Sequence, residues 1–169
     1  MRIVVSDTSC MIDLRKAGLL EAALGLPYTF VMPDTLFEDE WLSLNDAEKR
    51  PLLDLGLEVH GLPGPSVERA AWHFNQHRRL KLNDCFALTL AEEIEGCILL
   101  TGDGFLRRIA EGCGIEVRGV LWVTDELEAH GVVPLSLLHQ ALQLFHEDEL
   151  VYLPEREVRR RIRRLARRI

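Results

Sequence analysis

Hydrophobic residues along the chain alternate between short apolar runs and longer stretches with a helical period. Apolar runs of about four to eight residues rich in β-branched side chains predict buried strands, whereas apolar positions three and four apart predict amphipathic helices. We therefore expect strands at residues 2–6, 28–32, 57–62, 97–101 and 115–119. Helical stretches separate these strands, and that alternation favours an α/β fold with a parallel sheet covered on both faces.

The predicted helices are bounded by residues that break or cap helices. One covers residues 10–24 with a break near Gly18, and a second covers residues 34–55 with a break near Asn45. Asn83 is expected to cap a later helix that Gly96 ends. Further helices are expected from the Pro-Gly-Pro turn at 63–65 to about Arg79, and at 104–112, 120–130, 134–146 and 155–168.

Cysteine and histidine positions argue against a disulfide framework or a zinc site. The four cysteines form no C-x-x-C pair and stand in apolar patterns, so we expect buried thiols. They are Cys10, Cys85, Cys97 and Cys113. His73 and His77 are four residues apart, as zinc ligands on a helix can be, but no neighbouring Glu or Cys completes a ligand set. We interpret that pair as part of a solvent-exposed helix face.

The composition is that of a globular protein, with 47% hydrophobic and 28% charged residues in 169. A chain of this length fits one domain. No apolar run is long enough for a membrane span and no signal peptide is recognisable, so we expect a cytoplasmic protein without membrane contact. Residues 155–169 contain eight arginines and two glutamates, a local charge of +6. The net charge of the whole chain is −7, so the remaining residues have a net charge of −13.

Acidic residues stand where the predicted strands end. Asp7 follows the first strand directly, and Asp103 follows the fourth strand after a single glycine. Asp84 opens the helix before the fourth strand, and Glu38 lies about one helical turn beyond the second strand. Ligands of open parallel sheets bind beyond the carboxyl ends of the strands. We therefore expect these four side chains to converge on one crevice.

Each aspartate alone is equally well explained as a helix cap, and the acidic run at 38–40 as a solvated face. Caps do not need to converge, however. Several carboxylates in one crevice, with no lysine or arginine expected beside them, would repel one another strongly. A divalent cation would neutralise them, and the lack of paired His or Cys ligands favours Mg²⁺ or Mn²⁺. Such an ion can activate water and stabilise the departing oxygen of a phosphodiester, which is nuclease chemistry.

Three stretches resemble, in order, the acidic motifs of the PIN domain: VVSDTSCMIDL, MPDTLFEDE and LKLNDCFALTLAEEIEGCILLTGD. This family of metal-dependent ribonucleases includes the VapC-type toxins of bacterial and archaeal toxin–antitoxin systems. The resemblance covers most of the chain and implies a three-layer α/β/α fold with a central parallel sheet and a C-terminal helical extension. It also implies that the metal is held by Asp7, Glu38, Asp84 and Asp103, with Ser9 and Thr101 as supporting hydroxyls.

The motifs depart from the family pattern at several positions. Glu40 competes with Glu38 as the second acidic residue, and Gly102 and Gly104 flank Asp103 where polar residues are common in the family. Some members carry a further acidic residue after the fourth motif, where this chain has Phe105. The sequence therefore leaves open whether one metal ion binds or two.

The resemblance implies a Mg²⁺- or Mn²⁺-dependent endoribonuclease that is the toxin of a type II toxin–antitoxin pair. RNA would be its substrate, a small antitoxin its partner and a homodimer its assembly. Asn83 either contacts metal-bound water or phosphate, or only caps its helix. The alternative is a non-catalytic PIN-like module that binds RNA or protein. A phosphotransfer domain lacks support, because DTSC has no D-x-D pair and the paired acids and lysine of a receiver are missing.

Residues 121–166 resemble the helical extension of one toxin-like subgroup, so we divide the chain into a PIN-like catalytic domain at 1–120 and an extension at 121–169 packed on the same domain. In its last predicted helix, the apolar residues stand four, three and four residues apart. They are Val158, Ile162, Leu165 and Ile169. The arginines between them either bind RNA phosphates or stay solvated and paired with acidic residues of the body. The candidates for RNA binding are Arg159, Arg160, Arg163 and Arg164.

Overall fold

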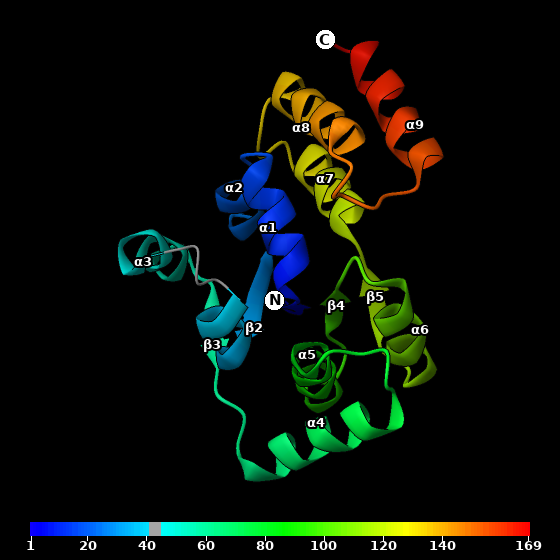
Figure 1. Ribbon diagram of the computed structural model, residues 1–169. Helices are drawn as coiled ribbons and strands as arrows, with labels where there is room; N and C mark the ends of the chain where they lie inside the picture. The colour runs from blue at the N-terminus through cyan, green and yellow to red at the C-terminus, as the bar shows by residue number, and fades with distance from the viewer. Residues whose placement is uncertain (41–44) are drawn as a thin grey trace.

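A five-stranded sheet lies at the centre of the computed structural model, which describes residues 1–40 and 45–169 (Figure 1). Its strands are β1 (Arg2–Ser6), β2 (Tyr28–Pro33), β3 (Glu58–His60), β4 (Ile98–Leu100) and β5 (Glu116–Arg118). They are ordered β3-β2-β1-β4-β5, and every neighbouring pair is parallel. The expected α/β fold with a central parallel sheet is therefore confirmed.

The strand ends differ from the predicted ones by one or two residues. β1 has the predicted bounds, and β2 extends through Pro33, which lacks an N–H donor and stands at the strand end, where that loss is tolerated. β4 is shorter than predicted because Thr101 leaves the strand, although its N–H still donates to the Arg118 carbonyl at 3.0 Å. All three residues of β4 are buried, as expected for a strand covered on both faces.

The helices also follow the predicted order. They are α1 (Thr8–Lys16), α2 (Leu20–Leu24), the π-helix η1 (Leu36–Glu40), α3 (Asp46–Asp54), α4 (Gly64–Gln76), α5 (Leu82–Glu93), α6 (Gly104–Gly112), α7 (Val120–Ala129), α8 (Leu135–Glu147) and α9 (Glu155–Ala166). Gly18 separates α1 from α2 with a φ of 69°, a conformation that favours glycine. Asn45 caps α3, as the predicted break implied. Trp41 and Leu44 of the predicted helix at 34–55 lie outside the described residues.

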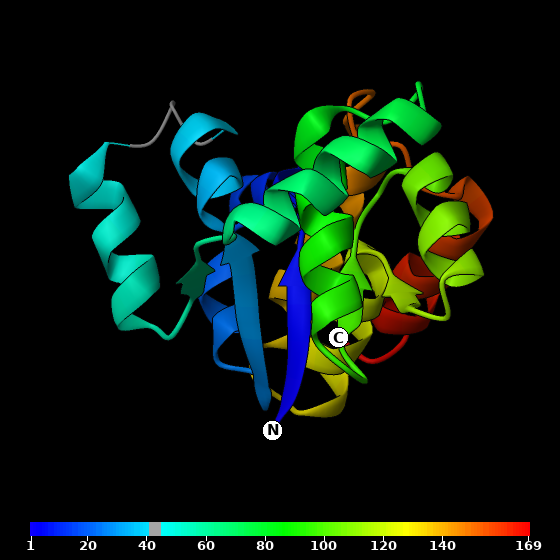
Figure 2. The ribbon, with the colours of Figure 1, turned by 90° about the horizontal axis from the view of Figure 1, so that it is seen from below.

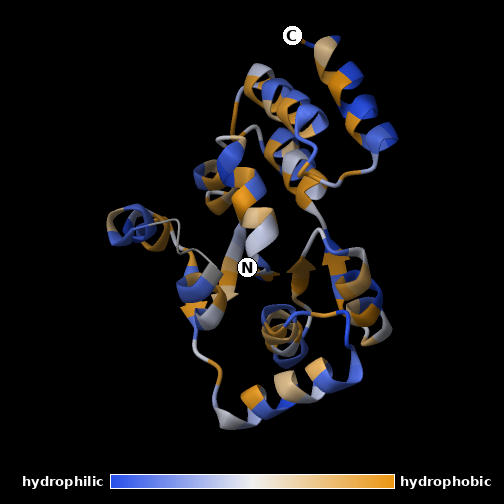
Figure 3. Ribbon diagram, in the orientation of Figure 1, coloured by the Kyte–Doolittle hydropathy of each residue, from blue (hydrophilic) through white to orange (hydrophobic). Residues whose placement is uncertain are grey.

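The helices form layers on both faces of the sheet. Figures 1 and 2 show α4 and α5 on one face, with α1, α2 and α7 on the other. α8 lies against α7, and α9 packs on α8, so these C-terminal helices form an outer layer. Figure 3 shows apolar residues concentrated in the strands and in helix faces turned inward. Among the described residues, no helix combines the length and apolar character needed to cross a membrane.

Helix α5 is the most buried helix because it is enclosed between the sheet and α4. Its residues from Cys85 to Ala91 are all buried, and it contacts β1, β2 and β4. A fully apolar helix surface is expected for an element covered on all sides. The rigid placement of α5 matters for the site, because its N-terminus lies at the carboxyl edge of the sheet.

Two expectations about cysteine and histidine are corrected. Cys113 is exposed at the end of α6, whereas the other three cysteines are buried as expected. His73 is 1% exposed and not solvated, because Glu92 of α5 pairs with its Nε2 at 2.9 Å and His77 stacks on its ring. The periodicity identified this face of α4 as polar, but it did not reveal that α5 covers it.

Candidate active site

The strand order places a topological switch between β1 and β4. The chain leaves β1 toward β2 and leaves β4 toward β5, and the connecting helices lie on opposite faces of the sheet (Figure 2). Such a point leaves a crevice beyond the carboxyl ends of the two strands. Asp7 follows β1, and its backbone N–H donates to the Leu100 carbonyl at the end of β4 at 3.0 Å. The ends of both strands are thus held together.

A pocket of about 170 Å³ opens at this edge of the sheet. The described residues that line it are Asp7, Thr8, Ser9, Leu36, Lys81, Asn83, Asp84 and Asp103. The structure therefore brings together three of the four acidic residues expected from the sequence, Asp7, Asp84 and Asp103. They come from three segments far apart in the chain.

Each of the three aspartates also holds the N-terminus of a helix. Asp7 Oδ1 accepts from the Cys10 N–H and the Ser9 hydroxyl, both at 3.0 Å. Asp103 Oδ1 accepts from two N–H groups of α6 at 2.8 Å, and Asp84 Oδ2 accepts from the Lys81 N–H at 2.8 Å. Capping and convergence therefore occur together. The caps fix the carboxylates in place, and a carboxylate that caps through one oxygen can coordinate an ion through the other.

Asp7 is the most deeply buried of the three, at 5% exposed. Burial raises the pKa of Asp7, and the nearby charge of Asp84 acts in the same direction. Hydrogen bonds from Thr101, the Cys10 N–H and Ser9 oppose that rise. A buried carboxylate next to a like charge gains stability from a cation, because the cation offsets both its lost hydration and the repulsion.

Thr101 and Ser9, the two hydroxyl residues named by the resemblance, hydrogen-bond the acidic segments of the pocket. The Thr101 hydroxyl hydrogen-bonds the Asp7 side chain and accepts from the Asp103 N–H at 3.0 Å. It is fully buried at the end of β4, so it links the acidic residues that follow β1 and β4. Ser9 lines the pocket and orients Asp7 by donating to Oδ1.

Lys81 lines the same pocket, which corrects the expectation that no cation stands beside the carboxylates. It is the N-cap residue of α5, so Asn83 is inside the first turn and does not cap that helix. Asn83 instead lines the pocket. The sequence pattern predicted a start of α5 that is two residues too late. Because of that error, the position of Lys81 beside the pocket was not predicted.

The structure does not bring Glu38 into the pocket with the aspartates. Glu38 is exposed on η1, and the pocket residue from that helix is Leu36. The side chain of Glu40, the other candidate of the second motif, lies outside the described part of the structure. The described acidic set of the pocket therefore consists of aspartates.

Thr8 is a pocket residue that the sequence reasoning missed. Its side chain is buried, and among the described residues its Oγ1 has no hydrogen-bond partner. A buried hydroxyl without a partner is costly, and one that lines an acidic pocket is suited to a ligand. The signal was present in the D-T-S sequence, where Ser9 was preferred over Thr8 as the supporting hydroxyl.

The donor set fits a hydrated magnesium or manganese ion. Carboxylate and hydroxyl oxygens are hard ligands, and Mg²⁺ keeps several water molecules while it binds one or two carboxylates. Within residues 1–40 and 45–169, no three His, Cys, Asp or Glu side chains are arranged to hold an ion directly.

Comparison with known proteins identifies the fold family. A family model described as "DUF3368: PIN domain" matches residues 3–167, which is nearly the whole chain. No curated protein matches the chain. PIN domains are generally nucleases that use divalent metal ions.

Proposed function

The chain belongs to the PIN-domain family, and on that premise we propose that it is a Mg²⁺- or Mn²⁺-dependent endoribonuclease. The observation that carries the proposal is the pocket lined by Asp7, Asp84 and Asp103 at the carboxyl ends of β1 and β4. Its buried carboxylate with a raised pKa favours a bound cation, as does the Thr8 hydroxyl, which has no hydrogen-bond partner among the described residues.

In this proposal the three aspartates would hold a divalent ion, partly through water, and the ion would supply water activation and charge stabilisation for phosphodiester cleavage. Ser9 and Thr101 fix the orientation of Asp7 through hydrogen bonds. Lys81 and Asn83 lie on the pocket wall, where an ammonium and an amide can contact a phosphate oxygen. Glu38 remains in the proposal as an outer carboxylate that acts through water.

The test is cleavage of RNA by the purified protein with Mn²⁺, repeated with EDTA. Asp84→Asn and Asp103→Asn keep an oxygen for the helix caps but remove the charge, so we expect each to lower the cleavage rate by more than about 100-fold. Asp54→Asn is the matched control, because Asp54 is exposed on α3 outside the pocket. Equal rates for all three variants and the parent would exclude this pocket as the catalytic site.

We also propose that the nuclease is the toxin of a type II toxin–antitoxin pair, with a small antitoxin partner and a homodimeric assembly in the cytoplasm. This part is supported by the resemblance to toxin-like PIN domains. Expression of the chain should arrest growth, and the product of an adjoining small open reading frame should relieve the arrest. Persistent growth during expression of an active enzyme would contradict the toxin role while leaving the nuclease proposal intact.

The second candidate is a non-catalytic module that binds RNA. The arginine-rich surface of α9 favours it, because that surface is separate from the acidic pocket. A binding module should retain RNA in EDTA and never convert it when Mn²⁺ is added.

A further inference from the structure

The eight arginines of residues 155–169 differ in their contacts: three attach α9 to α7, four share one exposed helix face, and Arg159 pairs with Glu155. Val158 and Leu165 are buried, so the apolar stripe of α9 faces the molecule. Arg161 is also buried, at 8% exposed, and its guanidinium donates to both oxygens of Asp125 at 2.8 and 2.6 Å. Arg164 and Arg168 pair with Glu128, also on α7. These three arginines therefore attach α9 to α7.

Four other arginines are exposed, and we call them the outer stripe. They are Arg156, Arg160, Arg163 and Arg167. Their spacings of four, three and four residues place them on one helix face, opposite the apolar stripe. Among the described residues, only Arg160 of this set has an ion pair, with Glu157.

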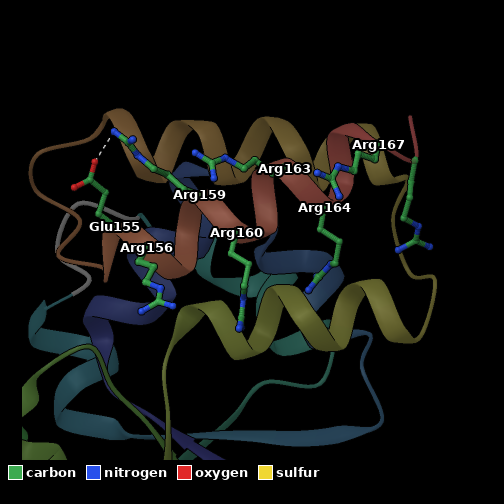
Figure 4. Close-up of a pocket in the computed structure, with 8 residues that line it drawn as sticks. Glu155, Arg156, Arg159, Arg160, Arg163, Arg164 and Arg167 are labelled. Carbon is green, nitrogen blue, oxygen red and sulfur yellow. Dashed lines mark ion pairs between the residues drawn. The ribbon is translucent and has the colours of Figure 1, made fainter.

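Figure 4 shows the side chains of this surface spread along α9. They line an open pocket of about 930 Å³. Eleven residues separate Arg156 from Arg167, so the outer stripe is about 16 Å long at 1.5 Å per residue. This length suits several consecutive charges of a linear polyanion.

We propose that the outer stripe binds the phosphodiester backbone of single-stranded RNA, an inference that rests on RNA being the substrate of the proposed nuclease. The body of the chain is strongly acidic and would repel a polyanion, so a separate basic surface has to supply the attraction. Guanidinium groups bind phosphate through paired hydrogen bonds, and three of the four have no ion pair to break first among the described residues.

The chemistry of the outer stripe favours RNA over a protein or a membrane. Arginine is also common at protein interfaces, but the fully buried core of such an interface is more apolar, and the outer stripe contains no apolar residue to form one. A membrane-bound amphipathic helix would insert its apolar face, but in α9 that face is buried against the molecule. Nucleic-acid interfaces are polar and strongly positive, as this surface is.

Tyr152 supports a single-stranded ligand. It is 86% exposed in the segment that leads into α9, two residues before the N-cap Pro154. Proteins that bind single strands combine a basic surface with aromatic side chains on which the unpaired bases stack. Tyr152, which is exposed four residues before Arg156, provides such a side chain.

The experiment measures the affinity for a labelled oligouridine in EDTA by fluorescence anisotropy over a range of salt concentrations. Each phosphate contact to a single strand contributes about 0.7 to the slope of log K against log salt. The triple variant Arg156→Gln, Arg163→Gln, Arg167→Gln should therefore reduce the slope by about 2 and weaken binding about 100-fold at 0.1 M salt. Its melting temperature should match the parent, since the buried side of α9 is unchanged.

The matched control is the triple variant Arg15→Gln, Arg50→Gln, Arg118→Gln, which changes the net charge equally at exposed positions outside α9. We expect it to keep the parent slope. An unchanged slope in the α9 variant, or an equal loss in the control, would overturn the proposal. Cleavage of RNA by the parent protein with Mn²⁺ separates the two proposals. If the parent cleaves RNA but the α9 variant keeps the parent salt slope, only the proposal for the outer stripe is refuted. If the α9 variant has a reduced slope but the parent does not cleave RNA, only the nuclease proposal is refuted.

Discussion

At the residue scale, the proposed function gives Asp7 two roles with opposite requirements, as a helix cap and as a metal ligand. As the N-cap of α1 it needs only an oxygen that accepts from the Cys10 N–H, which a neutral side chain can supply. As a metal ligand it needs a negative charge, and burial makes that charge costly and raises its pKa. In the metal-free fold the buried charge of Asp7 therefore lowers stability, and the proposed role of that charge is to bind the metal ion.

Asp7→Asn should separate these roles. We expect it to abolish cleavage and to raise the melting temperature of the metal-free protein at neutral pH, because asparagine keeps the cap and removes the buried charge. Asp7→Ala should also abolish cleavage but lower stability by about 1 kcal/mol relative to Asp7→Asn, because it loses the cap. Thermal melts in EDTA and cleavage assays with Mn²⁺ measure both effects. A less stable Asp7→Asn protein would show that the charge stabilises the fold.

Asp13 on α1 gives a pH-dependent prediction. Burial raises the pKa of Asp13 from 3.8 to about 6; the charge of Lys16 opposes this rise, and the charges of Asp7 and Asp148 add to it. The folded state therefore holds this proton more tightly than the unfolded state, so ionisation of Asp13 costs stability progressively between about pH 4 and pH 6. The full cost is present above pH 6 and absent below pH 4.

Asp13→Asn should accordingly stabilise the protein at pH 7.5 and have little effect near pH 4. The two-unit rise sets an upper limit of about 3 kcal/mol, and partial solvent exposure reduces the expected gain to about 1 kcal/mol. Urea unfolding of parent and variant at both pH values measures it. The same gain at both values would mean that the charge of Asp13 is not its cause.

The sequence located the site through its aspartates because each follows or precedes a buried apolar run that is easily recognised. Thr8 and Lys81 were missed for different reasons. Thr8 is identified only because its hydroxyl has no hydrogen-bond partner within the part of the chain that the structure describes, and this is a property of the fold. Lys81 lines the pocket because α5 starts at Leu82, and a sequence pattern does not define a helix start to within two residues.

At the element scale, the strands and most helices could be predicted because their apolar periods are long and unambiguous. η1 could not, because five residues are too few to distinguish a π-helix from an α-helix. The difference matters, since it is this helix that places Leu36 on the pocket wall and leaves Glu38 exposed.

The attachment of α9 to α7 gives the prediction at this scale. Arg161 joins Asp125 and Glu157 through charged hydrogen bonds, and Arg161→Ala leaves both carboxylates without that partner. Breaking a buried ion pair costs about 3 kcal/mol or more, and the partial exposure of Asp125 reduces the expected loss to about 2 kcal/mol. Arg163→Ala on the outer face should not change stability measurably. Urea unfolding compares the two, and equal losses would show that Arg161 has no special role.

At the scale of the whole molecule, the sequence revealed an acidic body and a basic C-terminal helix but not their contacts. Arg161 and Asp125 are 36 residues apart, and the hydroxyl of Tyr28 donates to Glu126, 98 residues away, at 2.7 Å. Judged by charge alone, many other acidic residues of the body could equally well have been the partners of Arg161 and Tyr28. The packing of α7 and α8 selects the partners, and it thereby decides which arginines remain available to a ligand. The division of the chain near residue 120 stays a prediction.

Divalent cations should stabilise the whole molecule, because an ion that binds the folded pocket and not the unfolded chain shifts the folding equilibrium. At a Mn²⁺ concentration about 100 times its Kd, the gain is about 2.7 kcal/mol, which raises the melting temperature of a chain this size by about 5 to 10 °C. Thermal melts with Mn²⁺ and with EDTA measure this without RNA. Asp84→Asn and Asp103→Asn should lose the shift, while Asp54→Asn keeps it. Each of the two pocket variants removes one carboxylate, and this has to weaken the binding of a cation held among the three aspartates. If both variants keep the shift in melting temperature, the ion binds elsewhere.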